Sequence, residues 1–427
     1  MNILDGQKNT FENRLIFLLS ERKKKIRSNS ASVTNIIKDV KKNGDKAIIK
    51  YEKKFNKNKT IIPSSSKIKK LIKSLNPKVK QAIDIAYDRI YKFHSLQKFK
   101  NISYTDKLKN KIEYKYLPLE SVAIYVPGST ASYPSSVLMN AIPAVIAGVK
   151  RIIMINPGYK GLQNPAVLYA AKKCKINEIY SIGGPSAIAA VAYGTKKIQK
   201  VNKIVGPGNS YVAAAKKEVF GDVGIESMTA GPSEVTIVCD KFSNPEWVAS
   251  DLIGQAEHDY LAQCILISKD KKFIENVKKE ISIQLNQIPR SSIARKSLND
   301  NGILIHLNSD KKIIDLVNRI APEHLELNIK NYKSFIPKIN NAGSICLGKY
   351  AVMAMTDYNV GSNHVLPTNG SAKYSSGISV NEFYKRISYI NLSKKGIESL
   401  GPSVITLANY EGLVGHAQSV KKRIRRK

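Results

Sequence analysis

The chain has 427 residues, a length that predicts about two or three domains. Hydrophobic residues make up 43% and charged residues 24%, so the composition excludes a wholly disordered protein and provides enough apolar residues for sizeable cores. The formal net charge is +36, and the excess positive charge comes mostly from Lys residues spread over every segment. A specific nucleic-acid-binding protein would cluster this charge and use more Arg. We therefore attribute the charge to a biased genome composition.

Cysteine usage and apolar runs predict the compartment. The four cysteines form no CxxC pair, and we expect them to be reduced thiols: Cys174, Cys239, Cys264 and Cys346. Residues 1–20 contain no basic region followed by an apolar stretch, so no signal peptide is evident. The longest apolar run, 141–149, is too short to cross a bilayer. We therefore expect a soluble, cytoplasmic protein with no membrane partner.

The predicted elements begin with helices. Over the first hundred residues, which are rich in Lys, apolar residues recur at helical spacing between Val33 and Val40, and Asn43-Gly44 then ends the run. Nothing in this region points to catalysis.

From residue 121 the pattern changes to short β-branched runs that lead into glycine or proline loops and then into Ala-rich helical stretches. These runs are 122–126, 152–155, 179–182 and 204–205. Their repetition predicts a parallel sheet with helices on both faces. Later runs predict a second α/β domain: 235–239, 264–267, 303–307 and 345–347. After about residue 380 the chain is again patterned as helix and ends in a basic cluster.

The glycine loops are candidate phosphate sites. Such loops at the carboxyl ends of parallel strands place backbone N–H groups at helix N-termini. The dinucleotide fingerprint GxGxxG is absent, however, because Tyr211 stands where the third glycine would follow Gly206 and Gly208. The alternative is that these glycines only turn tight corners, and spacing alone does not decide between the two.

Two motifs with histidine are predicted on helices. Gln255 and His258 would share one helix face and could converge on a cation, unless the histidine is merely a satisfied helix residue. Pro322 fits the first position of a helix, which would place Glu323 and His324 in its first turn. There the dipole favours a carboxylate beside a neutral imidazole, a pair that suits proton abstraction. The alternative is a Glu placed for the dipole alone.

Two further pairs lie closer to the C-terminus. Asp357 and His364 flank a segment with Gly and Asn that predicts a loop presenting a carboxylate and an imidazole, unless Asp357 only organises its own turn. Glu411 and His416 form a charged pair in the tail, and taken alone they indicate a solvated helix face.

Six longer motifs follow one another along the chain: IYVPG with YPSSVLMNAIPA (124–144), VGPGNSYV (205–212), AGPSEV (230–235), DLIGQAEH (251–258), APEHLE (321–326) and NHVLPT (363–368). These motifs, in the same order, resemble those of the histidinol dehydrogenase family. The similarity is dense over residues 119–385 and thinner on both sides.

The resemblance implies a zinc-dependent homodimer that oxidises L-histidinol to L-histidine through the aldehyde, using two NAD. It implies Glu323 and His324 as acid–base residues. The implied metal ligands are Gln255, His258, Asp357 and, reaching the site of the partner subunit, His416. The implied substrate-binding residues are Ser233, Gln255, His258, His324, Asp357, His364, Glu411 and His416. The implied NAD contacts are Tyr125, Asn209 and Ser186, the last of which stands where the family usually has Gln.

We therefore predict an α/β fold of two incomplete Rossmann-like, doubly wound domains, one inserted in the other. The expected segments are a helical N-terminal arm (1–20), a first domain with the metal and acid–base residues (21–125 and 235–380), an inserted domain with the glycine-rich loops (126–234) and a swapped C-terminal tail (381–427). Two alternative functions remain: a homologous dehydrogenase of another polar alcohol, such as a sulfonate diol, and a basic nucleic-acid-binding protein. Glu411 and His364 favour the cationic substrate histidinol.

Overall fold

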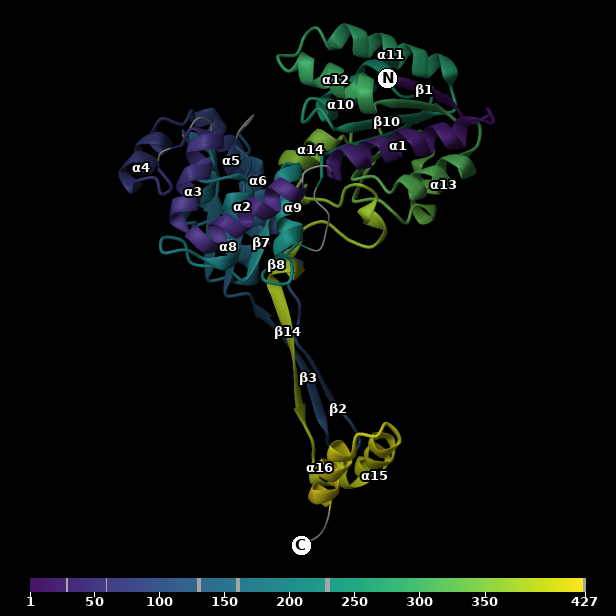
Figure 1. Cartoon of the computed structure of the whole chain (residues 1–427). Helices are drawn as coiled ribbons and strands as arrows, with labels where there is room; N and C mark the ends of the chain where they lie inside the picture. Colours follow the sequence, from purple (N-terminus) through teal and green to yellow (C-terminus); the bar gives the residue numbers. More distant parts are fainter. Residues whose placement is uncertain (28–29, 59, 129–131, 159–161, 227–230, 425–427) are drawn as a thin grey trace.

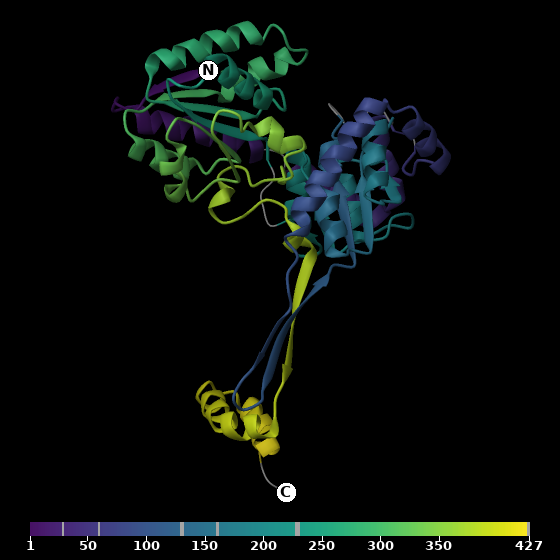
Figure 2. The ribbon, with the colours of Figure 1, turned by 180° about the vertical axis from the view of Figure 1, so that it is seen from behind.

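Two α/β lobes and a long arm make up the molecule (Figures 1 and 2). The computed structural model describes the chain except for residues 28–29, 59, 129–131, 159–161, 227–230 and 425–427 and the side chains of 25–31. The arm extends away from both lobes and carries the last helices at its far end. Among the helices within these described residues, none combines the length and the apolar character that crossing a bilayer requires.

The six-stranded lobe is built on a parallel sheet with the strand order β1-β11-β10-β9-β12-β13. These strands are β1 (Asn2–Asp5), β9 (Glu234–Cys239), β10 (Gln263–Ser268), β11 (Ile303–His306), β12 (His324–Asn328) and β13 (Ser344–Leu347). One face is covered by α10 (Pro245–Ala256), α11 (Lys271–Gln284) and α12 (Ser291–Asn301), the other by α1 (Phe11–Arg27) and α13 (Asp310–Ile320). Because both faces are covered, Ile237 and Val238 are both buried although they point to opposite sides.

The five-stranded lobe is also built on a parallel sheet, with the order β6-β5-β4-β7-β8. Its strands are β4 (Ser121–Tyr125), β5 (Arg151–Ile155), β6 (Glu178–Tyr180), β7 (Lys203–Val205) and β8 (Gly224–Ile225). One face carries α4 (Ser65–Lys73), α5 (Pro77–Ser95), α6 (Pro134–Ala147) and α7 (Pro165–Lys173); the other carries α2 (Ser30–Asn43), α3 (Asp45–Tyr51), α8 (Gly184–Tyr193) and α9 (Ser210–Val219). Two doubly covered parallel sheets confirm the predicted fold class.

The segments of the two lobes differ from the expected boundaries. The expected N-terminal arm begins with a strand, because Asn2–Asp5 pairs with β11 at the edge of the six-stranded sheet. The helices of residues 30–95 pack on the five-stranded sheet, not on the six-stranded one, because their apolar faces fill its two cores. Strand β4 belongs to that same sheet. The lobe with the glycine loops therefore starts near residue 30.

The arm combines segments that are far apart in the sequence. Its antiparallel sheet joins β2 (Ile102–Thr105), β3 (Lys111–Pro118) and β14 (Tyr384–Asn391). After a single 3-10 turn (Val380–Phe383), the tail therefore continues as a strand and not as the expected helix. Helices α15 (Lys394–Tyr410) and α16 (Val414–Ile424) follow and pack on each other. Apolar side chains are exposed along both parts, among them Ile390 and Leu407 at 67% and 62%. The arm thus lacks a covering layer within one chain.

Candidate functional site

The predicted acid–base residues lie at the amino edge of the six-stranded sheet. Parallel strands all begin at the same edge, and β12 begins at His324 while β9 begins at Glu234. Ser233 directly precedes β9, and its carbonyl accepts the N–H of Gln263, the first residue of β10, at 3.0 Å. In the five-stranded lobe, by contrast, the glycine loops follow the strands and therefore lie at the carboxyl edge of that sheet.

Glu323 and His324 are not in the first turn of a helix, so that prediction is wrong. Helix α13 ends just before them, and Ala321 takes a left-handed conformation with φ 51°. The carbonyl oxygen of Glu323 then accepts the N–H of Ser344 at 2.9 Å, and the chain continues as β12, paired with β13. The two side chains therefore do not stand at the start of a helix, where the dipole was expected to act on them.

Burial, and not a dipole, keeps the His324 imidazole neutral. It lowers the pKa of His324 to about 3, and the neighbouring imidazoles of His364 and His258 act in the same direction. Its Nε2 atom lies 3.7 Å from Oδ1 of Asp357, and its Nδ1 atom has no hydrogen-bond partner within the described residues. A neutral imidazole with an unused nitrogen is able to take a proton from a substrate.

The Glu323 carboxyl is buried at the same edge. Its Oε2 accepts the backbone N–H of Glu234 at 2.7 Å. Burial raises the pKa of Glu323 well above its usual range; the hydrogen bond from Glu234 and the charge of Arg22 oppose this shift, while the carboxylates of Glu234 and Asp357 add to it. A carboxyl group with a raised pKa holds a proton more tightly than an ordinary Glu, which suits a group that exchanges protons with a substrate or water.

Asp357 lies in the short helix α14 (Met353–Tyr358) and not in the predicted loop. Burial raises the pKa of Asp357 to about 7. His364 does lie in a loop, and its Nδ1 is 2.8 Å from the backbone oxygen of Asp357. Because a carbonyl only accepts, Nδ1 carries the hydrogen and Nε2 remains for another partner. Burial also lowers the pKa of His364 to about 4.

Gln255 and His258 do not share a helix face as predicted, because α10 ends at Ala256 and His258 lies in the turn beyond it. The backbone N–H of His258 still reaches the carbonyl of Gln255, at 3.3 Å. The Gln255 side chain is only 1% exposed, yet neither its Oε1 nor its Nε2 has a hydrogen-bond partner in the described part of the chain. A buried amide without a partner is costly, which indicates a partner from outside the chain.

The donor types at this edge fit a zinc ion. Gln255 offers an amide oxygen, His258 an imidazole nitrogen and Asp357 a carboxylate oxygen, a mixture that zinc accepts. Within the described residues, however, no group of three or more His, Cys, Asp or Glu side chains is arranged to hold a metal. Among these candidate ligands, the amide of Gln255 is the one whose polar atoms lack a hydrogen-bond partner within the described residues.

Glu411 and His416 are not brought to this site within one chain. Glu411 directly follows α15 and His416 lies in α16, so both belong to the far end of the arm (Figures 1 and 2). Both side chains are exposed.

The three predicted NAD contacts lie at the carboxyl edge of the five-stranded sheet. Tyr125 ends β4, and its hydroxyl accepts the N–H of Gly184 at 3.1 Å. Ser186 is in the first turn of α8, and its hydroxyl donates to the carbonyl of Gly183 at 3.1 Å. Asn209 caps α9.

One of the glycines in these loops has a structural role, which the sequence left open. Gly206 has φ 110°, and a Cβ atom there would lie 2.3 Å from the carbonyl oxygen of Tyr125. A side chain is therefore excluded at Gly206 by the close approach of β4.

Glu52 is a residue of this edge that the sequence analysis missed. Its Oε1 accepts the N–H of Gly183, the cap of α8, at 2.8 Å, and its Oε2 accepts from Asn56 at 2.9 Å. The carboxylate thus takes an N–H that a phosphate would otherwise use. Burial raises the pKa of Glu52 to about 7. No local motif marks this residue, which stands in the Lys-rich sequence YEKKFN.

Glu52→Gln should increase the stability of the protein more at pH 8 than at pH 5. The pKa of Glu52 is raised from 4.5 to about 7 on folding, so the unfolded chain loses this proton first as the pH rises, and the stability of the natural protein falls across that window. The gain from Gln should grow by about 2–3 kcal/mol between the two pH values. Urea unfolding at both pH values measures it. Glu178→Gln is the control, because the Arg151 guanidinium lowers the pKa of Glu178 and its effect should stay constant; an equal change in both variants would contradict the prediction.

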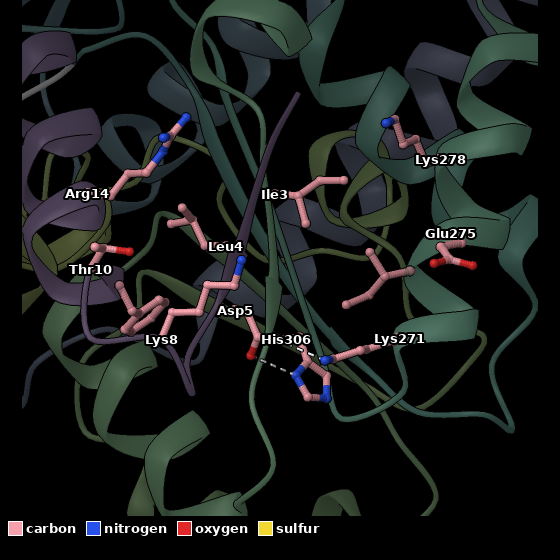
Figure 3. A pocket seen from close by; sticks show the side chains of 12 residues that line it. Ile3, Leu4, Asp5, Lys8, Thr10, Arg14, Lys271, Glu275, Lys278 and His306 are labelled. Atoms are coloured by element: carbon pink, nitrogen blue, oxygen red, sulfur yellow. Dashed lines mark hydrogen bonds and ion pairs between the residues drawn. The ribbon is translucent and has the colours of Figure 1, made fainter.

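A cleft of about 400 Å³ lies elsewhere, between the edge strand β1 and helices α1 and α11 (Figure 3). At its floor Asp5 contacts His306 at 3.2 Å and Lys271 at 3.0 Å. None of the site residues predicted from the sequence lines this cleft.

Comparison with known proteins gives the family. The family model described as histidinol dehydrogenase matches residues 19–424. The histidinol dehydrogenase of Pelagibacter ubique is 79% identical over all of both chains, and that of Brucella abortus is 45% identical over 97% of both. A crystal structure of histidinol dehydrogenase from Elizabethkingia anophelis has 38% identity and a TM-score of 0.90, covering 99% of this chain and 98% of that one. The resemblance in the six motifs is thereby confirmed, and the chain belongs to the histidinol dehydrogenase family.

Proposed function

We propose that both oxidations of L-histidinol, to the aldehyde and then to L-histidine, occur at the amino edge of the six-stranded sheet, with zinc and NAD as cofactors. The six-stranded lobe would hold the metal and the acid–base residues, and the five-stranded lobe would hold NAD. The observation that carries this proposal is the buried, neutral His324 imidazole beside Asp357, with the unsatisfied amide of Gln255 nearby in the same lobe.

The residues divide the proton transfers between them. His324 takes the hydroxyl proton of histidinol as hydride leaves the carbon, because burial has left its imidazole uncharged. Glu323 takes a proton from the water that adds to the aldehyde. His324, after releasing its first proton to solvent, takes the hydroxyl proton of the hydrate as that hydrate is oxidised. His364, Ser233 and Glu411 of the partner subunit orient the substrate. Gln255, His258, Asp357 and the partner's His416 would hold zinc, which would supply a Lewis acid for the substrate's imidazole and amine, and bound NAD would accept each hydride.

Product stoichiometry tests this reaction. The zinc-loaded protein should form two NADH for each histidinol consumed, and chelation should abolish turnover until zinc is restored. A sulfonate diol in place of histidinol should give no NADH. One NADH per substrate, or full turnover after chelation, would contradict the proposal.

Gln255→Leu should weaken zinc binding at least about 100-fold, since even outer-shell partners of a metal ligand contribute 10–100-fold. The metal-free variant should be as stable as the natural chain or more stable, because Leu replaces a buried amide that has no partner. Calorimetric zinc titration and thermal unfolding of the metal-free proteins measure the two effects. Gln284→Leu is the control, because its side chain at the end of α11 bonds Ser250 and the Glu246 carbonyl in the first half of α10, away from Gln255; unchanged zinc affinity in Gln255→Leu would remove this residue from the ligand set.

We also propose that the arm covers a second copy of the chain and delivers Glu411 and His416 to that copy's site. The exposed apolar side chains of β14 and α15 support this pairing, because an unpartnered arm would leave them in water. The four cysteines are unpaired and buried, which supports a reducing, cytoplasmic location.

A further inference from the structure

Arg22, in the last part of α1, places a buried guanidinium at the catalytic edge. α1 runs along the six-stranded lobe and ends near the other lobe (Figures 1 and 2). The Arg22 side chain is 3% exposed and forms an ion pair with Glu234, which is equally buried. Its further acceptors are the carbonyls of Pro232 and Leu261, at 2.7 and 2.8 Å, and the side chains of Gln263 and Asn369, both at 3.4 Å.

Through Glu234, these contacts connect Arg22 to the carboxylate of Glu323. The backbone N–H of Glu234 donates to the carboxylate of Glu323 at 2.7 Å, and the side chain of Glu234 also accepts the N–H of Asn369 at 3.1 Å. Pro232 precedes Ser233, and Leu261 lies in the turn that follows His258. One guanidinium therefore connects the loop before Ser233, the start of β9 and the turn after His258.

The guanidinium has two separable properties. Its planar fork carries five N–H donors, and contacts to three segments (232–234, 261–263 and Asn369) use that geometry, which a Lys ammonium cannot reproduce. Its charge is the cation that opposes the two neighbouring carboxylates, Glu234 and Glu323; Asp357 is the third acidic group facing Glu323. Removing one partner of a buried ion pair leaves the other charge uncompensated.

We propose that Arg22 is a positioning residue for aldehyde oxidation: it fixes Glu234, whose N–H holds the Glu323 carboxylate ready to activate water. This inference rests on the proposed role of Glu323 as the group that takes the proton of that water. It assigns a function to α1, a helix outside all six motifs.

Arg22→Met and Arg22→Lys, measured in the zinc-loaded protein, test the inference. Arg22→Met should lower kcat for histidinaldehyde about 100-fold, the size expected for a misplaced reacting group, with a smaller loss for histidinol and little change in KM. The acid limb of the aldehyde profile should move to higher pH, because a positive charge beside Glu323 is gone. Arg22→Lys should restore the position of that limb but only part of the rate.

Arg319→Met is the matched control, since its exposed pair with Glu12 also ties α1 to the lobe; both steps should stay near normal. Equal losses in both steps of Arg22→Lys would show a merely structural role and overturn the proposal, and they would do so even if Arg22→Met failed to fold. Glu323→Gln distinguishes a failure of the proposed role of Glu323 from a failure of the proposed role of Arg22. If Glu323→Gln mainly slows aldehyde oxidation and the Arg22 variants do not, only the inference about Arg22 is contradicted.

Discussion

Glu323→Gln should slow oxidation of histidinaldehyde about 1,000-fold while slowing oxidation of histidinol about tenfold or less. A general base contributes 10²–10⁴-fold to a step in which it moves a proton, and only the aldehyde step requires water to be activated. The amide keeps the shape of the carboxyl and can still accept the N–H of Glu234, so the edge of the sheet should remain folded. Single-turnover NADH formation with each substrate measures the two steps separately.

Glu326→Gln is a matched control for this experiment. Glu326 lies on β12, the strand that begins directly after Glu323; it is also buried and accepts the N–H of Met353 at 2.7 Å. Burial raises the pKa of Glu326 to about 8, so its side chain is largely a neutral acid at pH 7, which an amide imitates closely. This variant should retain both activities. Equal losses of the two steps in Glu323→Gln would argue that Glu323 shapes the site without activating water.

The parts of the fold that the sequence predicted are those set by local pattern. The run 122–126 is β4 (Ser121–Tyr125), and 152–155 lies within β5 (Arg151–Ile155), because a β-branched run before a glycine or proline loop has few other solutions. The prediction of a helix at Glu323 was wrong because pairing with distant segments, and not the local pattern, decides the structure there. Pro322 is typical of a helix start, but the pairing of His324 with Val235 and Ser344, both distant in sequence, imposes a strand.

The candidate site shows a similar division. Gln255, His258, Asp357 and His324 carry chemistry that a motif reveals, and the six-stranded lobe holds them all. Arg22 and Glu52 stand in Lys-rich helical sequence without any motif, and their partners Glu234 and Gly183 are 212 and 131 positions away. A charged residue in such a sequence looks like a solvated helix face until the tertiary fold buries it. Residues of this kind are accessible only from the structure.

Mixing inactive His258→Ala and His416→Ala proteins should restore about a quarter of the natural activity. In a heterodimer with swapped tails, one site receives both substitutions and the other receives neither. Random exchange gives heterodimers for half of the population, and each has one intact site of two. Each variant alone should have almost no activity, because every one of its sites would lack one of the two imidazoles proposed as zinc ligands. Subunits carrying two different affinity tags allow the heterodimer to be isolated, and it should then show half of the natural activity.

The structure makes this outcome a sharp test of where His416 acts. Within one chain, α16 lies at the end of an arm that extends away from both lobes, while His258 lies in the turn after α10 (Figure 1). If the arm folded back onto its own lobes, every site of a heterodimer would carry one substitution and no activity would return. His306→Ala is a suitable control for the effect of a His→Ala substitution outside the candidate site, because His306 lines the separate cleft of Figure 3. Activity from isolated His258→Ala/His416→Ala heterodimers therefore requires that each arm reaches across to the other subunit.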